Sequence, residues 1–291
     1  MDPRQLAALA AVLEQGSFEQ GARRLNVTQA TVSQRIRQLE ERLGCPVVVR
    51  SQPVRATEAG LKLYRHQQQL QLLERELAVQ LPQLQESGRP RLKVAVNADS
   101  LATWFLDAVA RVKDELLLDL TVEDQDVTLN RLKAGEVMAA VSAFGRPVQG
   151  CRVLPLGTMS YTAVAGPAMA ERDFAGVEPA VAFRRATALV YGRHDQLVSQ
   201  FLAGFGLRDT DVESHTMPAA QSFIDAALGG IAWTLVPLLQ ARPYLDSGQL
   251  VELSPRHRMK VPLFWHHWRL PASRLERLTA AVLQSAQLLG K

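Results

Sequence analysis

Residues 26–44 read NVTQATVSQRIRQLEERLG, and the interpretation of the whole N-terminal region depends on this stretch. Its apolar residues recur every three or four positions, which predicts one amphipathic helix with a single apolar stripe. The stripe consists of Val32, Ile36, Leu39 and Leu43. Thr28 is expected to cap this helix, because its hydroxyl can accept a hydrogen bond from an amide of the first turn.

The face opposite the stripe is polar and carries no bulky apolar side chain. It consists of Ala30, Gln34, Arg37 and Glu41, flanked by Gln29, Thr31, Ser33 and Gln38. Amides, hydroxyls and guanidinium groups hydrogen-bond the edges of bases and phosphate oxygens. Most amphipathic helices, however, simply expose a polar face to water. Taken alone, the stretch leaves both interpretations open.

Two shorter helices are expected before this one, and they favour nucleic-acid binding. The first is marked by Leu6, Leu9, Val12 and Leu13 and ends at Gly16. Ser17 is expected to cap the second, whose apolar side consists of Phe18, Ala22 and Leu25. Asn26 and Val27 then make a brief turn. Two helices joined by a tight turn, with the last helix offered to the major groove, form a helix-turn-helix.

A small β-wing is expected after the third helix. Residues 47–50, VVVR, read as a short strand, and a Pro-containing turn over residues 51–54 leads to Arg55. One arginine therefore stands on each side of the wing. Beside a helix-turn-helix we expect Arg50 and Arg55 to contact phosphates. Without that context they would be solvated residues of an ordinary surface hairpin.

Residues 1–62 resemble the winged helix-turn-helix of the LysR-type transcriptional regulators. The matching residues are SFEQGARRLNVTQATVSQRIRQLEERLG (17–44) and VVVRSQPVRATEAG (47–60), with Val48-Val49 in place of the usual Leu-Phe. The resemblance implies binding to double-stranded operator DNA. Bases would be contacted by Gln29, Ala30, Ser33 and Gln34. Phosphates would be contacted by Thr28, Thr31, Arg37, Arg50 and Arg55.

The composition favours a folded chain of two or more domains. Of its 291 residues 47% are hydrophobic, and a net charge of +4 is compatible with a nucleic-acid partner without requiring one. We expect a cytoplasmic protein without a membrane partner, because no apolar run could span a bilayer and the N-terminus lacks a secretion signal. Cys45 and Cys151 are expected to be reduced thiols, and no metal site is expected.

A long helix is expected over residues 57–85. Leucines recur every seven residues at positions 63, 70, 77 and 84, and Leu73 and Leu81 fill part of the second seam position. A seven-residue repeat predicts a helical partner, and self-pairing would present two recognition helices to two half-sites. The alternative is a helix that packs on its own domain. Residues 86–90, ESGRP, have the composition of a hinge.

Strands and helices alternate over residues 91–291, which predicts an α/β domain with a parallel sheet covered by helices on both faces. Strands are expected at 91–97, 116–124, 137–143, 156–165, 180–191, 212–216, 231–237 and 261–265. Helices are expected at 99–105, 127–135, 195–205, 219–228 and 273–289, the first of them capped by Asp99 or Ser100. The domain divides into lobe I (about 91–160 and 265–291) and lobe II (about 161–264). Ligands settle at the carboxyl ends of such strands.

This region resembles the effector-binding domain of the same family, which is similar in fold to periplasmic binding proteins. Three segments look like the arginine- and lysine-responsive ArgP/LysG branch: VAVNADSLATWFL (94–106), TVEDQDVTLNRLKAGEVMAAVS (121–142) and LFWHHW (263–268). Gln221 departs from that branch, where an acidic residue is expected. The resemblance implies lysine or arginine as effector, no cofactor, and a homotetramer of two dimers that controls amino-acid transport or metabolism genes. A contact with RNA polymerase is left open.

A basic amino acid needs opposite charges at its two ends, and the strand ends offer both. Its carboxylate suits a helix N-terminus, where Ser100 adds a hydroxyl. Its cationic groups need carboxylates, which Asp99, Glu123 and Asp124 could supply. The candidate effector residues are completed by Ser142, Gln221 and Trp265. Ordinary alternatives are a helix cap for Asp99, solvated strand ends for the other two acids, a tight corner for Ser142 and core packing for Trp265.

No enzyme motif stands out in the chain. There is no GxSxG elbow, no P-loop and no GxGxxG after a strand, and the histidines lack metal-ligand spacing. Our main hypothesis is therefore a ligand-responsive DNA-binding regulator. Two alternatives stay open: a ligand-independent architectural DNA binder, and a small-molecule-binding protein or enzyme with a vestigial helix-turn-helix.

Overall fold

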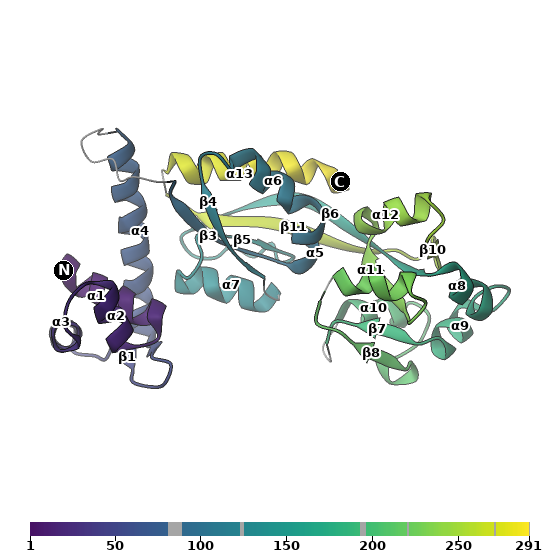
Figure 1. Ribbon diagram of the computed structural model, residues 1–291, viewed down its shortest axis with the longest axis horizontal. Coiled ribbons are helices and arrows are strands. Elements are labelled where there is room, and N and C mark those ends of the chain that lie inside the picture. Colours follow the sequence, from purple (N-terminus) through teal and green to yellow (C-terminus); the bar gives the residue numbers. More distant parts are fainter. Residues whose placement is uncertain (81–88, 123–124, 193–195, 220, 271, 291) are drawn as a thin grey trace.

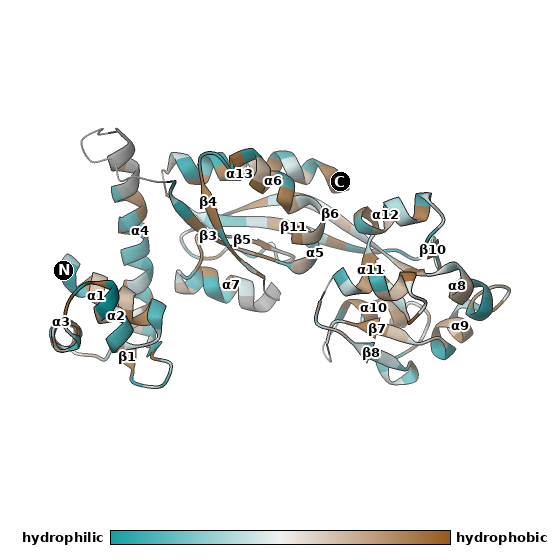
Figure 2. Cartoon of the chain, in the orientation of Figure 1, coloured by the Kyte–Doolittle hydropathy of each residue, from teal (hydrophilic) through white to brown (hydrophobic). Residues whose placement is uncertain are grey.

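The computed structural model of the chain describes residues 1–80, 89–122, 125–192, 196–219, 221–270 and 272–290. The molecule is elongated, with the N-terminal helices at one end, the long helix α4 beside them and a two-lobed α/β region beyond (Figure 1). Figure 2 shows that the coloured part of α4 is predominantly hydrophilic, whereas the strands of the sheet are more hydrophobic. Within the described ranges, no helix is both long enough and apolar enough to cross a lipid bilayer.

Three helices form the N-terminal bundle: α1 (Pro3–Gln15), α2 (Phe18–Arg24) and α3 (Gln29–Leu43). The expected caps are confirmed. Gly16 ends α1 with a φ of 65°, the side chain of Ser17 accepts a hydrogen bond from the amide of Gln20, and Thr28 caps α3. Asn26 has a φ of 53°, a left-handed conformation that asparagine tolerates in a tight turn.

The apolar stripe of α3 forms the centre of the bundle's core. Val32, Ile36 and Leu39 are fully buried in one cluster with Leu9 and Val12 of α1. The expected stripe is one turn too long, because Leu43 is 40% exposed. Residues 41–46 are all exposed, so the last turn of α3 extends beyond the core.

The β-wing consists of two short antiparallel strands, β1 (Val48–Val49) and β2 (Arg55–Ala56). Glu40 of α3 holds the base of the wing, since its Oε1 accepts from the amides of Val47 at 2.9 Å and Val48 at 3.4 Å. The position of the wing relative to α3 is therefore set by a side chain on the helix itself.

Helix α4 (Glu58–Gln80) joins the bundle to the α/β region. Its leucines lie in two environments. Leu72, which is outside the expected seam, is 1% exposed and belongs to the core of the α/β region, whereas the seam residues Leu73 and Leu77 are 38% and 51% exposed. The helix thus packs on its own chain and also leaves apolar residues uncovered. Residues 81–88, with two of the seam leucines and most of the expected hinge, lie outside the described residues.

One mixed sheet runs through both lobes, in the order β4-β3-β5-β11-β6-β9-β7-β8, with β10 beside β6. Its strands are β3 (Arg91–Val96), β4 (Leu117–Val122), β5 (Ala139–Ser142), β6 (Cys151–Ala165), β7 (Ala188–Val190), β8 (Ser214–Thr216), β9 (Trp233–Pro237), β10 (Val251–Glu252) and β11 (Met259–Trp268).

The expectation of a wholly parallel sheet is wrong. Strands β3, β4 and β5 are parallel, and so are β7, β8 and β9, but β6 and β11 are antiparallel to each other and to their outer neighbours. Alternating strands and helices along the chain do not reveal that two of the strands are shared by both lobes.

Strands β6 and β11 form a two-stranded ribbon between the lobes. Their pairing runs from Cys151 and Trp268 at the lobe I end to Tyr161 and Met259 at the lobe II end. The register shifts between Leu263 and Phe264. Such irregularities bend and twist the paired strands. A movement of one lobe relative to the other therefore has to bend or twist this ribbon.

Helices cover the sheet, and Figure 1 shows α6 and α13 over one face of the lobe I strands and α7 over the other. The lobe I helices are α5 (Ala98–Ser100), α6 (Leu106–Val112), α7 (Gln125–Ala134) and α13 (Ser273–Ser285), with a π-helical segment, Leu101–Phe105, between α5 and α6. The lobe II helices are α8 (Pro167–Asp173), α9 (Pro179–Arg185), α10 (Gln196–Ala203), α11 (Gln221–Leu228) and α12 (Leu238–Asp246).

Residues 180–191 were expected to be strand throughout, and the first half of that expectation is wrong. Helix α9 precedes the short strand β7 there. Pro179 occupies the first turn of α9, and the carboxylate of Glu178 accepts a hydrogen bond from the amide of Val181 at 3.1 Å. A proline in the first turn and a side-chain cap both favour a helix start.

Candidate nucleic-acid interface and small-molecule site

The residues expected to contact DNA gather on the outer face of α3 and on the wing. On and just before α3, the exposed residues are Thr28, Gln29, Ala30, Gln34 and Arg37. Thr31 and Ser33 are half-buried. This face is exposed because the opposite face of α3 packs against α1. There, Val32, Ile36 and Leu39 are fully buried.

The first turn of α3 has the features of an anion-binding helix end. Thr28 Oγ1 accepts from the amide of Thr31 at 3.2 Å and shares a 2.8 Å hydrogen bond with the Thr31 hydroxyl. The turn contains no acidic residue. The partial positive charge at the start of a helix favours phosphate there when no carboxylate is present to neutralise it.

The two wing arginines are exposed on either side of the turn. The guanidinium of Arg50 lies 5.5 Å from the centroid of the Phe18 ring, so the side chain is held against α2. Within the described chain, neither Arg37, Arg50 nor Arg55 takes part in an ion pair. Three cationic groups are therefore presented around α3 without an internal counter-ion.

Candidate effector residues cluster where strands β3 and β5 end. These strands are parallel, with Val94 opposite Ala139 and Ala95 opposite Ala140, so Asn97 and Ser142 reach the same edge of the sheet. Asp99 is half-buried just beyond this edge, and its Oδ2 accepts a hydrogen bond from the Tyr161 hydroxyl at 2.8 Å. The carboxylate is thereby oriented by a side chain from the interlobe ribbon.

Two polar atoms beside Asp99 are buried and unpaired. Ser100 Oγ and Asn97 Oδ1 find no hydrogen-bond partner among the described residues. A buried polar atom without a partner is costly, and one frequent explanation is a ligand or water that completes it. The π-helical segment that follows Ser100 is a further departure from regular structure of a kind common at functional sites.

The other expected effector residues fall in different surroundings. The Ser142 hydroxyl accepts a hydrogen bond from the amide of Phe144 at 3.1 Å. It therefore stabilises a tight corner of the chain, which was the ordinary alternative to a role in effector binding. Gln221 is exposed at the first position of α11 in lobe II. Glu123 and Asp124 lie outside the described residues.

Trp265 lies in the core of lobe I rather than at an exposed strand end. Its ring is fully buried, its Nε1 donates to Thr279 Oγ1 of α13 at 3.1 Å, and its centroid lies 6.3 Å from that of Phe105. Alternate residues of a strand face opposite sides of the sheet. Trp265 faces the side that α13 covers, so it packs in the core, which was the ordinary alternative for this residue.

Sequence reasoning missed the role of Tyr161. This tyrosine is 62 positions from Asp99 along the chain and lies on the strand that was expected over residues 156–165. Nothing in the local pattern indicates which face of that strand meets Asp99. Asn97 could have been singled out, because it directly follows the last apolar residue of β3.

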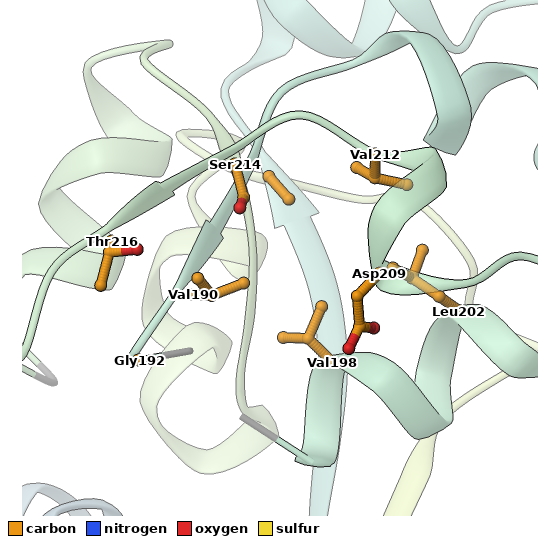
Figure 3. A pocket seen from close by; sticks show the side chains of 9 residues that line it. Val190, Gly192, Val198, Leu202, Asp209, Val212, Ser214 and Thr216 are labelled. Carbon is orange, nitrogen blue, oxygen red and sulfur yellow. The ribbon is translucent and has the colours of Figure 1, made fainter. Parts of the chain in front are cut away.

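A separate small pocket lies within lobe II, between strands β7 and β8 and helix α10 (Figure 3). Its volume is about 120 Å³, and it is lined by Ala188, Val190, Gly192, Val198, Leu202, Asp209, Val212, Ser214 and Thr216. Small side chains on the two strands leave this space. The pocket includes none of the expected effector residues.

The adjacent histidines of β11 are both buried. Burial lowers the pKa of His266 and of His267 below the ordinary value, and each ring contacts a backbone carbonyl. Both rings are therefore neutral at pH 7.

In the described part of the chain, no three His, Cys, Asp or Glu side chains are grouped as a metal site would require.

Two family descriptions match the chain. Residues 3–61 match "Bacterial regulatory helix-turn-helix protein, lysR family", and residues 85–287 match "LysR substrate binding domain". Together the two matches cover most of the sequence, and residues 62–84, which include most of α4, lie between them.

Similar proteins are found along the full length of the chain. It is 46% identical over 288 residues to the HTH-type transcriptional regulator ArgP of Pseudomonas fluorescens (strain Pf0-1), covering 98% of this chain and 97% of that protein.

Solved structures agree with these relatives. The crystal structure of ArgP from Mycobacterium tuberculosis is 39% identical with a TM-score of 0.90, covering 100% of this chain and 99% of that chain. Full-length LysG from Corynebacterium glutamicum with bound effector Arg is 33% identical with a TM-score of 0.81, covering 100% of both chains.

Proposed function

The chain belongs to the LysR family of bacterial helix-turn-helix transcriptional regulators, and from that premise we propose which residues contact DNA and which hold the effector. Regulators of this kind bind DNA and respond to a small molecule. One observation carries the proposal: a single chain contains both an exposed polar helix, α3, and a two-lobed domain with a polar site. In that site, Ser100 Oγ and Asn97 Oδ1 are buried without a hydrogen-bond partner among the described residues.

We propose that α3 enters the major groove and that its outer face reads bases through Gln29, Ala30, Ser33 and Gln34. Phosphates are contacted by Thr28, Thr31, Arg37, Arg50 and Arg55. The exposure of this face and the absence of an acidic residue in the first turn of α3 support the assignment. Arg50, held on Phe18, needs less ordering on binding than a freely rotating arginine.

The uncovered leucines of α4 support a homodimer. Leu73 and Leu77 together form an exposed apolar strip on a helix that is predominantly hydrophilic. Pairing of two α4 helices would bury that strip and place two copies of α3 for two half-sites of operator DNA. Two such dimers form the proposed tetramer.

Because its target is bacterial DNA, we place the regulator in the cytoplasm and assign no catalytic step to it.

For the effector, we propose a basic amino acid, arginine or lysine. The support is the bound arginine named for LysG and the polarity of the site here. Asp99 supplies a carboxylate for an ammonium or guanidinium group, while Ser100 Oγ and Asn97 Oδ1 supply unpaired buried atoms for the backbone end of the ligand. Glu123 and Asp124 stay in the proposal on the sequence argument, as second carboxylates at the neighbouring strand end.

Ser142 and Gln221 are assigned supporting roles. Ser142 shapes the corner at the end of β5, where its hydroxyl already holds the amide of Phe144. Gln221, exposed at the start of α11, offers a neutral amide where the branch is expected to carry an acid. The loss of that acid favours binding in which Asp99 is the main counter-charge.

Thermal unfolding of the full chain with L-arginine and L-lysine tests the effector. A ligand at 100 times its Kd stabilises the folded state by about 2.7 kcal/mol, which raises the melting temperature by several degrees. Asp99→Asn and Ser100→Ala should reduce this shift. Asp119→Asn, which removes the same charge from an exposed position on β4, should leave it unchanged.

Gel-shift titration with genomic promoter fragments tests DNA binding. A specific complex that weakens with salt and responds to the amino acid supports the proposal. A specific complex that ignores every amino acid would instead favour the ligand-independent architectural binder. Amino-acid binding without any specific complex would favour a small-molecule-binding protein with a vestigial helix-turn-helix.

A further inference from the structure

Helix α4 is docked on lobe I through one arginine that reaches the end of the interlobe ribbon. Arg65 donates from Nη2 to the carbonyl oxygen of Gln149 at 2.9 Å and lies 3.7 Å from Cys151 Sγ. Its guanidinium is 5.8 Å from the ring centroid of Trp268. Cys151 and Trp268 are the paired residues at the lobe I end of the ribbon formed by β6 and β11.

The approach of α4 to lobe I at this point is close enough to restrict the sequence. A Cβ atom on Gly135, which follows α7, would lie 2.6 Å from the Cβ of Arg65. Leu72, two turns further along α4, is buried in the lobe I core. The helix is therefore seated on the lobe both at Arg65 and two turns further along, at Leu72.

A second contact joins the N-terminal bundle to α4 and to lobe I. The Glu14 carboxylate of α1 accepts from the Tyr64 hydroxyl at 3.0 Å and from Gln68 Nε2 at 2.8 Å, and it forms an ion pair with Arg24 of α2. Burial and the nearby carboxylate raise the pKa of Tyr64 well above its ordinary value, so it remains a donor.

The same carboxylate reaches lobe I. Lys93 Nζ lies 3.6 Å from Glu14 Oε1. Lys93 is on β3, and the carboxyl end of that strand leads directly to Asn97 and Ser100 of the candidate effector site. One strand thus contacts the DNA-binding bundle at one end and the effector residues at the other.

We propose that Arg65 and Glu14 form a two-point clasp that holds the DNA-binding bundle in one orientation on lobe I and carries effector-driven lobe movement to α3. The inference rests on the proposed function for the effector. Lobe movement bends the ribbon, the ribbon end shifts Cys151 and Trp268, and Arg65 transmits that shift to α4. Glu14 keeps the bundle and α4 moving together.

The clasp is not arranged for maximal stability. Arg65 Nε is buried and has no acceptor within the described chain. An unpaired buried donor costs free energy, so the observed contact is one that a second arrangement could replace at little loss.

The first test measures the orientation of the bundle without any ligand. Cys45 is exposed and Cys151 is buried, so a probe attaches selectively to Cys45, and Asp114→Cys supplies a second exposed position on lobe I. Distances between the two probes are measured in the full chain diluted into excess unlabelled protein. Arg65→Ala should broaden the distance distribution relative to the wild type, whereas Arg172→Ala, in an exposed pair with Asp173 on lobe II, should not.

An unchanged distribution in Arg65→Ala would overturn the clasp. If that variant does not fold, Arg65→Lys replaces it. Lysine keeps the charge but loses the planar group that contacts the carbonyl and the ring together.

The second test measures coupling between L-arginine and DNA. Coupled sites typically change each other's affinity by about 5- to 150-fold. Arg65→Ala should reduce the wild-type factor by about 2- to 30-fold, while calorimetry finds unaltered arginine binding. A variant that keeps the full wild-type response would contradict the inference. If the wild type responds to neither arginine nor lysine, the proposed effector fails, and the clasp is then decided by the distance measurement.

Discussion

Replacement of Arg37 by alanine separates DNA contact from fold stability. Arg37 is exposed on α3, and within the described chain it takes part in no ion pair. The core beneath it, formed by Val32, Ile36 and Leu39, does not include this side chain. We therefore expect Arg37→Ala to change the free energy of unfolding by less than about 0.5 kcal/mol.

The expected effect on DNA affinity follows from counterion release. Each phosphate neutralised contributes about 0.9 to the slope of log K against log salt concentration, so two copies of α3 in a dimer contribute roughly 1.8. Between 50 and 200 mM salt the logarithm of the concentration changes by about 0.6. The ratio of wild-type to variant affinity should therefore shrink roughly tenfold over that range.

The assay is fluorescence anisotropy with an operator fragment that the protein itself selects from genomic DNA, repeated across a salt series. Arg172→Ala is the matched control, because it removes one arginine from an exposed ion pair in lobe II. The reasoning is refuted if the plots for Arg37→Ala and the wild type are parallel, since Arg37 would then neutralise no phosphate.

Three further predictions concern the wing, the dimer and the response to pH. Gly60→Ala should destabilise the bundle by about 3 kcal/mol or more in chemical denaturation, because its Cβ would lie 1.9 Å from the Val47 carbonyl oxygen; an unaltered midpoint would show that the wing can move away. Leu77→Glu should shift the sedimentation coefficient toward that of a monomer, since it places a charge on the exposed strip of α4; an unchanged assembly would assign the dimer contact elsewhere. Burial lowers the pKa of His266, so below about pH 6.5 the unfolded state binds more protons than the folded state and stability falls as the pH drops. His266→Gln should make the melting temperature depend less on pH between pH 7.5 and 5.5. An equally steep dependence in the variant would assign the loss of stability to other groups.

Much of the N-terminal region could be derived from the sequence because its determinants are local. A cap such as Thr28 acts on an amide three residues away, and the stripe of α3 follows from helical periodicity. The wing follows from a short apolar run and a turn. Even here the limit of local reasoning is visible at Leu43, whose exposure depends on where the bundle ends.

The effector region was predicted less completely. The positions of the strand ends followed from the apolar runs, and Asp99 and Ser100 do lie together beside Asn97. The antiparallel ribbon, the burial of Trp265 and the helix at α9 did not follow, because a strand looks the same in sequence whichever neighbour it pairs with and whichever face is covered.

By itself, the sequence determined the winged helix-turn-helix, the long heptad helix and the family of the chain, since each depends on residues close together or on a pattern that repeats. Only the tertiary structure decided that Tyr161 orients Asp99 and that Arg65 reaches Cys151, across 62 and 86 positions of chain. Those contacts depend on how the ribbon crosses between the lobes and how α4 docks on lobe I. Neither arrangement is encoded in the spacing of neighbouring residues, because both result from the joint packing of elements distant in the chain.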